Sequence, residues 1–129
     1  MKIFFQSEKF DSHALLKKFS DNNKKSGSII SFTGQVRPMR NKKKITSIDI
    51  ELYKKMAYVQ TKKIAKKIVK QKKINDFLIV HRYGRLYPEE NIIFIAAASE
   101  HRAEGFFFTE EIILWFKKRI TFWKKENFK

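Results

Sequence analysis

Residues 91–99 form an almost uninterrupted apolar run with the sequence NIIFIAAAS. A strand with one face in water alternates apolar and polar residues, whereas a strand buried on both faces has a nearly continuous apolar sequence. The run therefore predicts a fully buried strand. An apolar helix over residues 103–119 is predicted to follow it almost at once. The rest of the chain is expected to form the scaffold around these two elements.

Most of the other predicted elements are strands. Apolar alternation and helical spacing predict strands over residues 2–6, 28–36, 45–53 and 76–82, a helix capped by Ser7 or Asp11 that runs through Phe19, and an amphipathic helix over residues 56–73. Residues 38–44 are interpreted as a charged, mobile loop, and residues 83–88 as a bend. The order β-α-β-β-α-β-β-α favours an α+β sandwich over a doubly wound sheet. No linker or repeat interrupts residues 1–129, so a single domain is expected.

Composition restricts both the chemistry and the setting of the chain. With 129 residues, of which 43% are hydrophobic, the chain can bury a core and is not disordered. The absence of cysteine excludes disulfides, thiolate nucleophiles and thiolate metal sites, and it fits a cytoplasmic location. The N-terminal segment has only a short apolar run, so no signal peptide is expected. No apolar run approaches the ~18 residues that a membrane-spanning helix needs.

The formal net charge of +16 would by itself suit a nucleic acid or an anionic lipid as partner. Lysine greatly outnumbers arginine, however, and lysine is the less specific reader of phosphate. The lysine run on the predicted helix 56–73 contains no arginine, and its one aromatic residue is Tyr58. A nucleic-acid surface interleaves basic and aromatic residues, so a solvated helix face is the favoured interpretation. We therefore expect no specific nucleic acid and no membrane as partner.

The functional side chains indicate cationic chemistry. The four glycines are scattered and form no phosphate-binding loop, and the three histidines lack metal-ligand spacing. His101 and Arg102 stand between the buried strand and the next helix, where free amides and the helix dipole favour an anion such as a phosphate. Arg37, which follows another strand, is expected to approach the same anion from a second loop. The alternative role of His101 and Arg102 is a polar cap of the strand.

Two lysines lie seven residues apart near the end of the sequence. Lys117 is close to the end of the last predicted helix, and Lys124 follows a short connection in which Phe122 and Trp123 are interpreted as core anchors. Crowding by neighbouring basic residues favours loss of a proton from one amine, which then becomes a nucleophile or a proton acceptor. From these residues alone, a basic helix end that complements the helix dipole is the better explanation.

Five segments occur in the order and spacing of a known family. They are SFTGQVR at 31–37, IELYKKM at 50–56, VHRYGRLYPEE at 80–90, SEHRAEGF at 99–106 and FKKRITFWKKE at 116–126. From about residue 28 to residue 126, the chain resembles the MoaE family, the large, catalytic subunits of molybdopterin synthase, and the last two segments are the specific ones. The resemblance implies an α+β fold of the hammerhead type with an additional antiparallel sheet. It also implies an enzyme that uses no metal and no organic cofactor.

The resemblance further implies a substrate and partners. In that family, two large subunits form a central homodimer, and two small ubiquitin-like subunits complete a heterotetramer. Each small subunit inserts a Gly-Gly C-terminal tail whose thiocarboxylate supplies sulfur to cyclic pyranopterin monophosphate. The product is the dithiolene of molybdopterin, in molybdenum cofactor biosynthesis. A sulfurtransferase of this kind is expected in the cytoplasm.

Matched motif by motif, the resemblance assigns the residues of the site. The arginine of the family's GxVR motif falls on Arg37, and the His-Arg pair falls on His101 and Arg102. The two catalytic lysines of the family fall on Lys117 and Lys124. The positions that border the substrate are Gln35, Val36, Lys125 and Glu126.

Two departures from the family pattern lie outside these candidate residues. Leu52-Tyr53-Lys54-Lys55 replaces the common His-Tyr-Pro-Gly, so the entry to the long helix is expected to differ, and Gly105 replaces the usual alanine. Two other classes of function stay open on the sequence. One is a small basic RNA- or DNA-binding module, and the other is a non-catalytic interaction subunit with the same fold.

Overall fold

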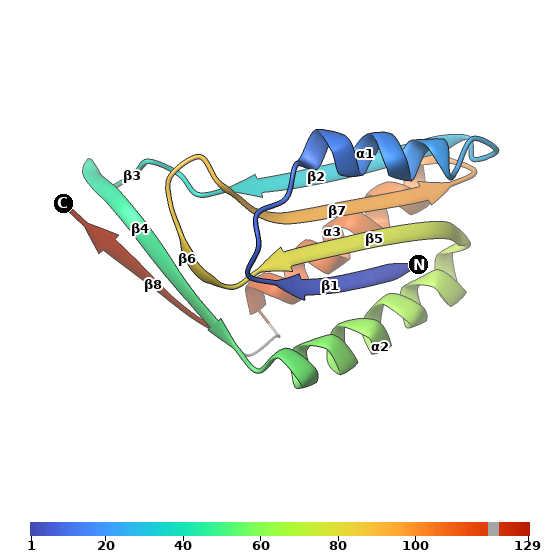
Figure 1. The fold of residues 1–129 in the computed structure, drawn as a ribbon. Coiled ribbons are helices and arrows are strands. Elements are labelled where there is room, and N and C mark those ends of the chain that lie inside the picture. The colour runs from blue at the N-terminus through green and yellow to red at the C-terminus, as the bar shows by residue number, and fades with distance from the viewer. Residues whose placement is uncertain (119–121) are drawn as a thin grey trace.

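Two β-sheets meet at an angle in the computed structural model, which describes residues 1–118 and 122–129 (Figure 1). In chain order the elements are β1 (Lys2–Gln6), α1 (Ser12–Asp21), β2 (Ser28–Gln35), β3 (Met39–Arg40), β4 (Lys43–Leu52), α2 (Lys54–Lys72), β5 (Ile74–Arg82), β6 (Gly84–Leu86), β7 (Asn91–Ser99), α3 (Arg102–Lys118) and β8 (Phe122–Phe128). The first sheet has the order β1-β5-β7-β2, in which only β1 and β5 are parallel. The second has the order β3-β4-β6, and β8 also pairs with β4. The α+β class and the additional antiparallel sheet are therefore confirmed.

Strand β7 is buried on both faces, as its sequence predicts. Seven of its nine residues are buried. Successive side chains of a strand point to opposite faces, so one set packs with α2 and α3 and the other with α1. The first set is Ile93, Ile95 and Ala97, and the second is Phe94, Ala96 and Ala98. Figure 1 shows the same layers, with α1 over one face of the sheet and α2 and α3 over the other.

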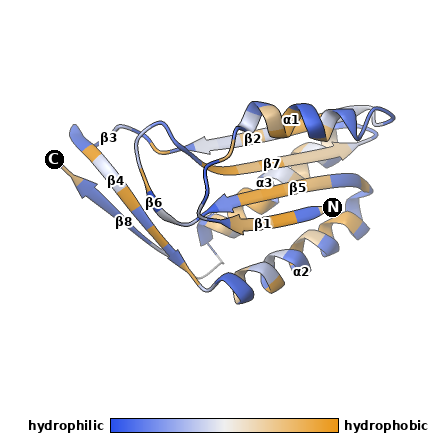
Figure 2. Cartoon of the chain, viewed as in Figure 1, coloured by the Kyte–Doolittle hydropathy of each residue, from blue (hydrophilic) through white to orange (hydrophobic). Residues whose placement is uncertain are grey.

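Helix α2 has the predicted amphipathic pattern and begins two residues earlier than expected. Its buried residues are Ala57, Thr61, Ala65 and Ile68. The spacing of three to four residues places them on one stripe, and the lysines occupy the solvent side. In Figure 2, hydrophobic and hydrophilic residues therefore alternate along the ribbon of α2. Within residues 1–118 and 122–129, no helix combines the length and the apolar character needed to cross a membrane.

The second sheet covers a core of its own. This core contains Val36, Ile45, Ile48, Ile50 and Leu86. Residues 45–52 of β4 pair with residues 122–128 of β8, so the segment after the last helix extends as a strand. The sequence predicted only a short connection there, and this prediction was incomplete because the strand contains two adjacent lysines and shows no clear alternation.

Three local predictions change in the structure. Residues 38–44 are not an irregular loop, because β3 and the start of β4 form a hairpin whose turn residues Asn41 and Lys42 have φ angles of 51° and 66°. The predicted bend at 83–88 contains the short strand β6. Asp11, and not Ser7, caps α1, since its carboxylate accepts hydrogen bonds from the amides of His13 and Ala14. The predicted helix end at Arg119 lies outside the described residues.

Candidate active site at the corner between the two sheets

A pocket of about 350 Å³ lies where the second sheet meets the end of α3. Its walls come from β2, β4, β7, α3 and β8. The lining residues are Gln35, Val36, Arg37, Ile45, Ile48, Ile92, Lys117, Lys124 and Glu126. Six of the nine site residues that the sequence and the resemblance predict are therefore together in one pocket of a single chain.

The two lysines reach the pocket from different elements. Lys117 lies in the last turn of α3, where a cation is favoured by the unpaired carbonyls and the negative end of the helix dipole. Lys124 is on β8 opposite Ile50, a buried residue of β4, so its side chain leaves the strand on the inner face. Phe122, two residues earlier on the same face, packs against both apolar cores near this corner. The anchoring role predicted for Phe122 is thus confirmed.

Lys125 does not line the pocket, although the resemblance places it beside the substrate. It follows Lys124 in β8 and is opposite Asp49, so alternation directs it to the outer face of the sheet. Hydrogen bonds from Arg85 and Asn127 lower the pKa of Asp49 to about 2, and the positive charge of Lys125 adds to this effect. Within one chain, Lys125 therefore belongs to an exposed ion cluster on the other side of β8. Trp123 points outward as well and is 54% exposed, so the prediction of a core anchor was wrong for this residue.

Arg37 is held in place by the residue before it. The ladder between β2 and β7 shifts register between Gly34 and Gln35. Beyond this bulge, Val36 continues the pairing, because its amide donates to the Glu90 carbonyl at 2.9 Å and its carbonyl accepts from the Glu89 amide at 2.8 Å. The Val36 side chain is only 1% exposed and belongs to the second core. It therefore anchors the segment, while the exposed side chain of Arg37 is left for a ligand.

The pocket carries an excess of positive charge. Among the described residues that line it, Arg37, Lys117 and Lys124 contribute three cations, and Glu126 is the one carboxylate. Glu126 is also neutralised, because its side chain, 10% exposed, forms an ion pair with Arg40 of β3. A cluster of cations on partly apolar walls attracts and orients anions, such as phosphates and thiocarboxylates.

His101 and Arg102 are not part of this pocket. Arg102 begins α3, whereas Lys117 is in its last turn. Fifteen residues of α-helix separate them, which corresponds to about 22 Å along the axis. Ser99 pairs with Ser28 at one end of the β2–β7 ladder, and Asn91 pairs with Gln35 at the other. The expectation that Arg37, His101 and Arg102 converge within one chain was therefore wrong.

Sequence reasoning passed over two residues that lie beneath the pocket. His81 and Arg82 end β5, and they are only 4% and 5% exposed. The His81 ring lies 4.9 Å from the ring of Phe116 and 5.6 Å from that of Phe122, measured between centroids. Burial, with a smaller contribution from the charge of Lys124, lowers the pKa of His81 to about 4, although its hydrogen bond with the Arg82 carbonyl acts in the opposite direction. The sequence feature that could have identified them is a pair of consecutive polar residues at the end of an apolar strand.

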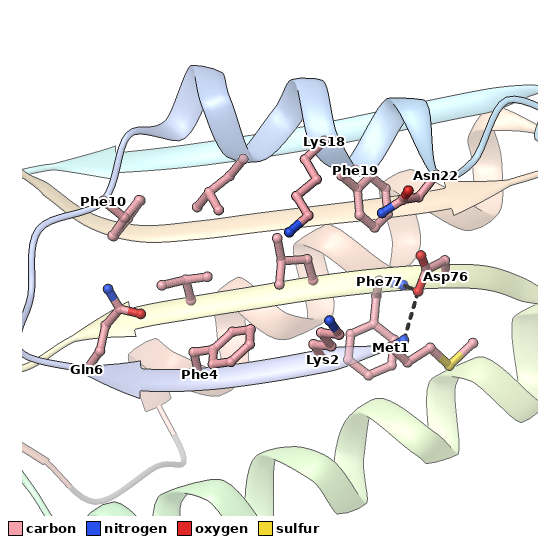
Figure 3. A pocket seen from close by; sticks show the side chains of 13 residues that line it. Met1, Lys2, Phe4, Gln6, Phe10, Lys18, Phe19, Asn22, Asp76 and Phe77 are labelled. Atoms are coloured by element: carbon pink, nitrogen blue, oxygen red, sulfur yellow. Dashed lines mark hydrogen bonds and ion pairs between the residues drawn. The ribbon is translucent and has the colours of Figure 1, made fainter.

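A second hollow, of about 360 Å³, lies between α1 and the strands β1 and β5 (Figure 3). Its floor is mostly apolar and includes Phe4, Leu78 and Val80. At its edge the Met1 ammonium group pairs with Asp76 at 3.0 Å. None of the predicted site residues lines this groove. In the part of the chain that the structure describes, no group of three or more His, Cys, Asp or Glu side chains is arranged to hold a metal ion.

Comparison with known proteins agrees with the geometry. The family model described as "MoaE protein" matches residues 5–119. A protein of Cereibacter sphaeroides named "Molybdopterin synthase catalytic subunit" is 36% identical over 126 residues, which cover 98% of this chain and 85% of that protein. The crystal structure of molybdopterin synthase from Staphylococcus aureus superimposes with a TM-score of 0.87 at 26% identity, covering 100% and 93% of the two chains. A MoaE protein from Burkholderia ambifaria gives a TM-score of 0.84 at 29% identity, covering 98% and 87%. The chain belongs to the MoaE protein family.

Proposed function

We propose that this chain is the catalytic subunit of a molybdopterin synthase. Its substrate is then cyclic pyranopterin monophosphate, and its product carries the dithiolene sulfurs of molybdopterin. The observation that carries the proposal is the convergence of Arg37, Lys117 and Lys124 on one pocket from three separate segments of the chain. A phosphate-bearing substrate and an anionic sulfur donor both require such a cationic pocket.

The sulfur donor is a second protein. Relatives of this chain are named as catalytic subunits, a name that implies at least one further subunit. We propose a small ubiquitin-like subunit that inserts a Gly-Gly tail ending in a thiocarboxylate. The tail is anionic, so it suits a pocket lined by Lys117 and Lys124. The cysteine-free composition and the family membership support a cytoplasmic location, which is part of this proposal.

Each sulfur transfer is a covalent exchange between the tail and the pterin. The thiocarboxylate sulfur forms a C–S bond to a carbon of the substrate, while a C–O bond at the same carbon breaks and the departing oxygen takes up a proton. This exchange joins the tail to the pterin as a thioester. Water then adds to the thioester carbonyl, the bond between the acyl carbon and sulfur breaks, and the tail leaves as a carboxylate. Arg37 binds the substrate phosphate, while Lys117 and Lys124 orient the anionic tail and transfer the protons that hydrolysis requires.

His101 and Arg102 serve the same substrate only if a second copy of the chain supplies them. The family resemblance predicts a homodimer, and the separation of Arg102 from Lys117 along α3 makes this arrangement testable. Equal amounts of Lys117→Ala and Arg102→Ala proteins are mixed and allowed to exchange subunits. If each site combines two chains, mixed dimers contain one intact site, and random exchange restores about one quarter of wild-type sites. If the residues act within one chain, activity stays at the level of the single variants.

Lys117 provides the test of the chemistry. Wild-type protein and variants are incubated with a thiocarboxylated small subunit and cyclic pyranopterin monophosphate, and molybdopterin is measured. Lys117→Ala is expected to lose at least ~100-fold in kcat, the usual scale of a general acid or base contribution. Lys117→Arg keeps the charge but cannot release its proton, so it is expected to fall nearly as far.

Lys118→Ala is the matched control, because Lys118 lines a different hollow between α2 and α3. Its activity is expected to stay within ~2-fold of wild type. Near-wild-type turnover by a folded Lys117→Ala protein would refute the mechanism and favour a non-catalytic interaction subunit.

The structure gives little support to the alternative of a nucleic-acid-binding module. Two aromatic residues near the lysine-rich face of α2 are engaged within the protein. The indole nitrogen of Trp115 donates to the Thr61 hydroxyl at 3.0 Å, and the Lys72 ammonium group lies 4.6 Å from the centroid of the Phe107 ring. Rings held in this way are not free to stack on bases.

A further inference from the structure

We infer that the dipeptide His81–Arg82 is the positioning element of the candidate active site, with His81 setting the lysine pair and Arg82 setting the segment that carries Arg37. This inference rests on the proposed function. Neither residue lines the pocket, so both act through the residues that do. Consecutive residues of a strand point to opposite faces of the sheet, which lets one short segment support two sides of the site.

His81 packs against the two segments that carry the lysines. Phe116 immediately precedes Lys117 on α3, and Phe122 lies two residues before Lys124 on β8. The His81 ring contacts both, with centroid distances of 4.9 Å and 5.6 Å, and it also lies 6.1 Å from the ring of Phe5. A rigid ring between these aromatic residues fixes the end of α3 relative to the start of β8, and with it the spacing of the two amines.

The chemical state of His81 suits this role. Its Nδ1 lies 2.8 Å from the Arg82 carbonyl oxygen, which can only accept, so Nδ1 carries the hydrogen. The ring is therefore held in one orientation by its own backbone. Because it is buried among aromatic rings, it stays uncharged at neutral pH and adds no positive charge beside Lys124.

Arg82 supports the opposite side through Glu90. Its guanidinium group donates from Nε and Nη2 to the Ser7 carbonyl, at 3.0 and 2.8 Å, and from Nη1 to the Glu90 carboxylate at 3.3 Å. That carboxylate also accepts from the Tyr87 amide at 3.0 Å and pairs with Lys9. The turn before β7 is thereby fixed from both sides.

The backbone of the same turn holds Arg37. Glu90 accepts a hydrogen bond from the Val36 amide, and the Glu89 amide donates to the Val36 carbonyl. Arg82 therefore reaches Val36, the residue before Arg37, through three steps: from its guanidinium group to the Glu90 carboxylate, from that carboxylate to the turn, and from the turn to Val36. If the turn loosens, Arg37 loses its fixed position while the lysines keep theirs.

Substitutions of the two residues are therefore expected to change different kinetic constants, kcat for His81 and KM for Arg82. His81→Leu is expected to lower kcat by ~10- to 100-fold with KM within ~3-fold, because misplacing catalytic groups by about 1 Å costs up to 10²-fold. His81→Phe restores a ring of similar size and is expected to keep kcat within ~3-fold of wild type. Phe77→Leu is the matched control, since Phe77 lies on the same face of β5 and packs with Phe108 at 5.1 Å, away from the lysines.

Arg82→Met is expected to raise KM for cyclic pyranopterin monophosphate by ~10-fold or more, with kcat within ~3-fold. Arg82→Lys keeps the charge and is the second variant if Arg82→Met fails to fold.

In an Arg37→Ala background, Arg82→Met is expected to add less than ~2-fold to the dissociation constant of the substrate measured by calorimetry, because its effect passes through Arg37. In a Lys117→Ala background the full effect should remain. Arg85→Met, which removes only an exposed pair with Asp49, is the control.

Hydrogen exchange gives a readout that does not depend on turnover. The Val36 amide should exchange faster in Arg82→Met than in wild type, and equally fast in His81→Leu and wild type. The inference is overturned if both variants change kcat and KM alike, if the Phe77→Leu control loses as much kcat as His81→Leu, or if Arg82→Met is additive with Arg37→Ala. If Arg37→Ala and Lys117→Ala themselves leave activity unchanged, the proposed function fails instead.

Discussion

Replacing His81 by phenylalanine should change how the stability of the protein depends on pH. His81 is buried and its pKa is lowered from 6.5 to about 4 in the folded state. Between these two values the unfolded chain binds a proton that the folded protein excludes. Stability linked to His81 is therefore fully present above pH 6.5 and is lost as the pH falls toward 4. His81→Phe keeps an aromatic ring in the same site but cannot bind a proton, so this loss should disappear.

The size of the effect follows from the shift. Each unit of pKa difference corresponds to about 1.4 kcal/mol. Because of His81, the free energy of unfolding of wild type falls by roughly 2 kcal/mol from pH 7 to pH 5 and by roughly 3 kcal/mol from pH 7 to pH 4. His81→Phe also loses the hydrogen bond to the Arg82 carbonyl, a pH-independent cost of about 1 kcal/mol. Wild type should thus be more stable by about 1 kcal/mol at pH 7 and less stable by about 1 kcal/mol at pH 5.

Urea denaturation at 25 °C, followed by fluorescence at pH 7, 6, 5 and 4.5, measures this difference. The carboxylates of Asp49, Asp76 and Glu90, whose pKa values are lowered, also lose stabilising interactions in acid, but they do so in both proteins and cancel. Phe77→Leu is the control, because it should shift the free energy of unfolding equally at every pH. Parallel curves for wild type and His81→Phe, within about 0.5 kcal/mol, would show that His81 is not buried as described.

Three further predictions follow from other parts of the structure. Lys125→Ala should keep activity within ~3-fold of wild type, since Lys125 faces away from the pocket; a ~100-fold loss would show that it acts in the site after all. Gly27→Ala should destabilise the fold by about 1–3 kcal/mol in urea denaturation, because an added Cβ would lie 2.2 Å from the backbone oxygen of Glu100; an unchanged midpoint would contradict this close approach. Binding to RNA or DNA should be weak and fall steeply with salt, as counterion release predicts; sequence-selective binding in gel-shift assays at about 150 mM salt would contradict it.

The elements with the strongest apolar patterns were predictable from the sequence alone. β1 and β7 begin and end at the predicted residues, because apolar side chains such as Ile3 and Phe5 in β1 and Ile95 in β7 fill core positions that polar residues cannot occupy. Helix α2 was predicted to within two residues at each end for the same reason. An element with a face that water cannot reach has apolar residues at a regular spacing, and this spacing can be recognised in the sequence.

Strand β8 was not predictable in this way. In the described part of the chain it pairs with β4 alone, far earlier in the sequence, and its exposed face carries lysine and asparagine. The stabilising contacts are therefore non-local, and no local pattern reports them. This limit has a direct effect on the site, because only the strand register shows that Lys124 faces the pocket and Lys125 does not. The local sequence pattern does not distinguish two adjacent lysines until the alternation of the strand is known.

The position of His101 and Arg102 could not be predicted for a different reason: the sequence does not show whether two strands pair parallel or antiparallel. Arg37 and the His101–Arg102 pair each follow the end of a strand, and strand ends converge at one edge when the strands are parallel. β2 and β7 are antiparallel, so the end of one lies beside the start of the other. No rearrangement of a loop can close the gap, because α3 itself carries Arg102 at its first residue and Lys117 in its last turn. If all these residues act on one substrate, a second molecule must supply one of the two sets, and the predicted homodimer becomes a requirement of the chemistry.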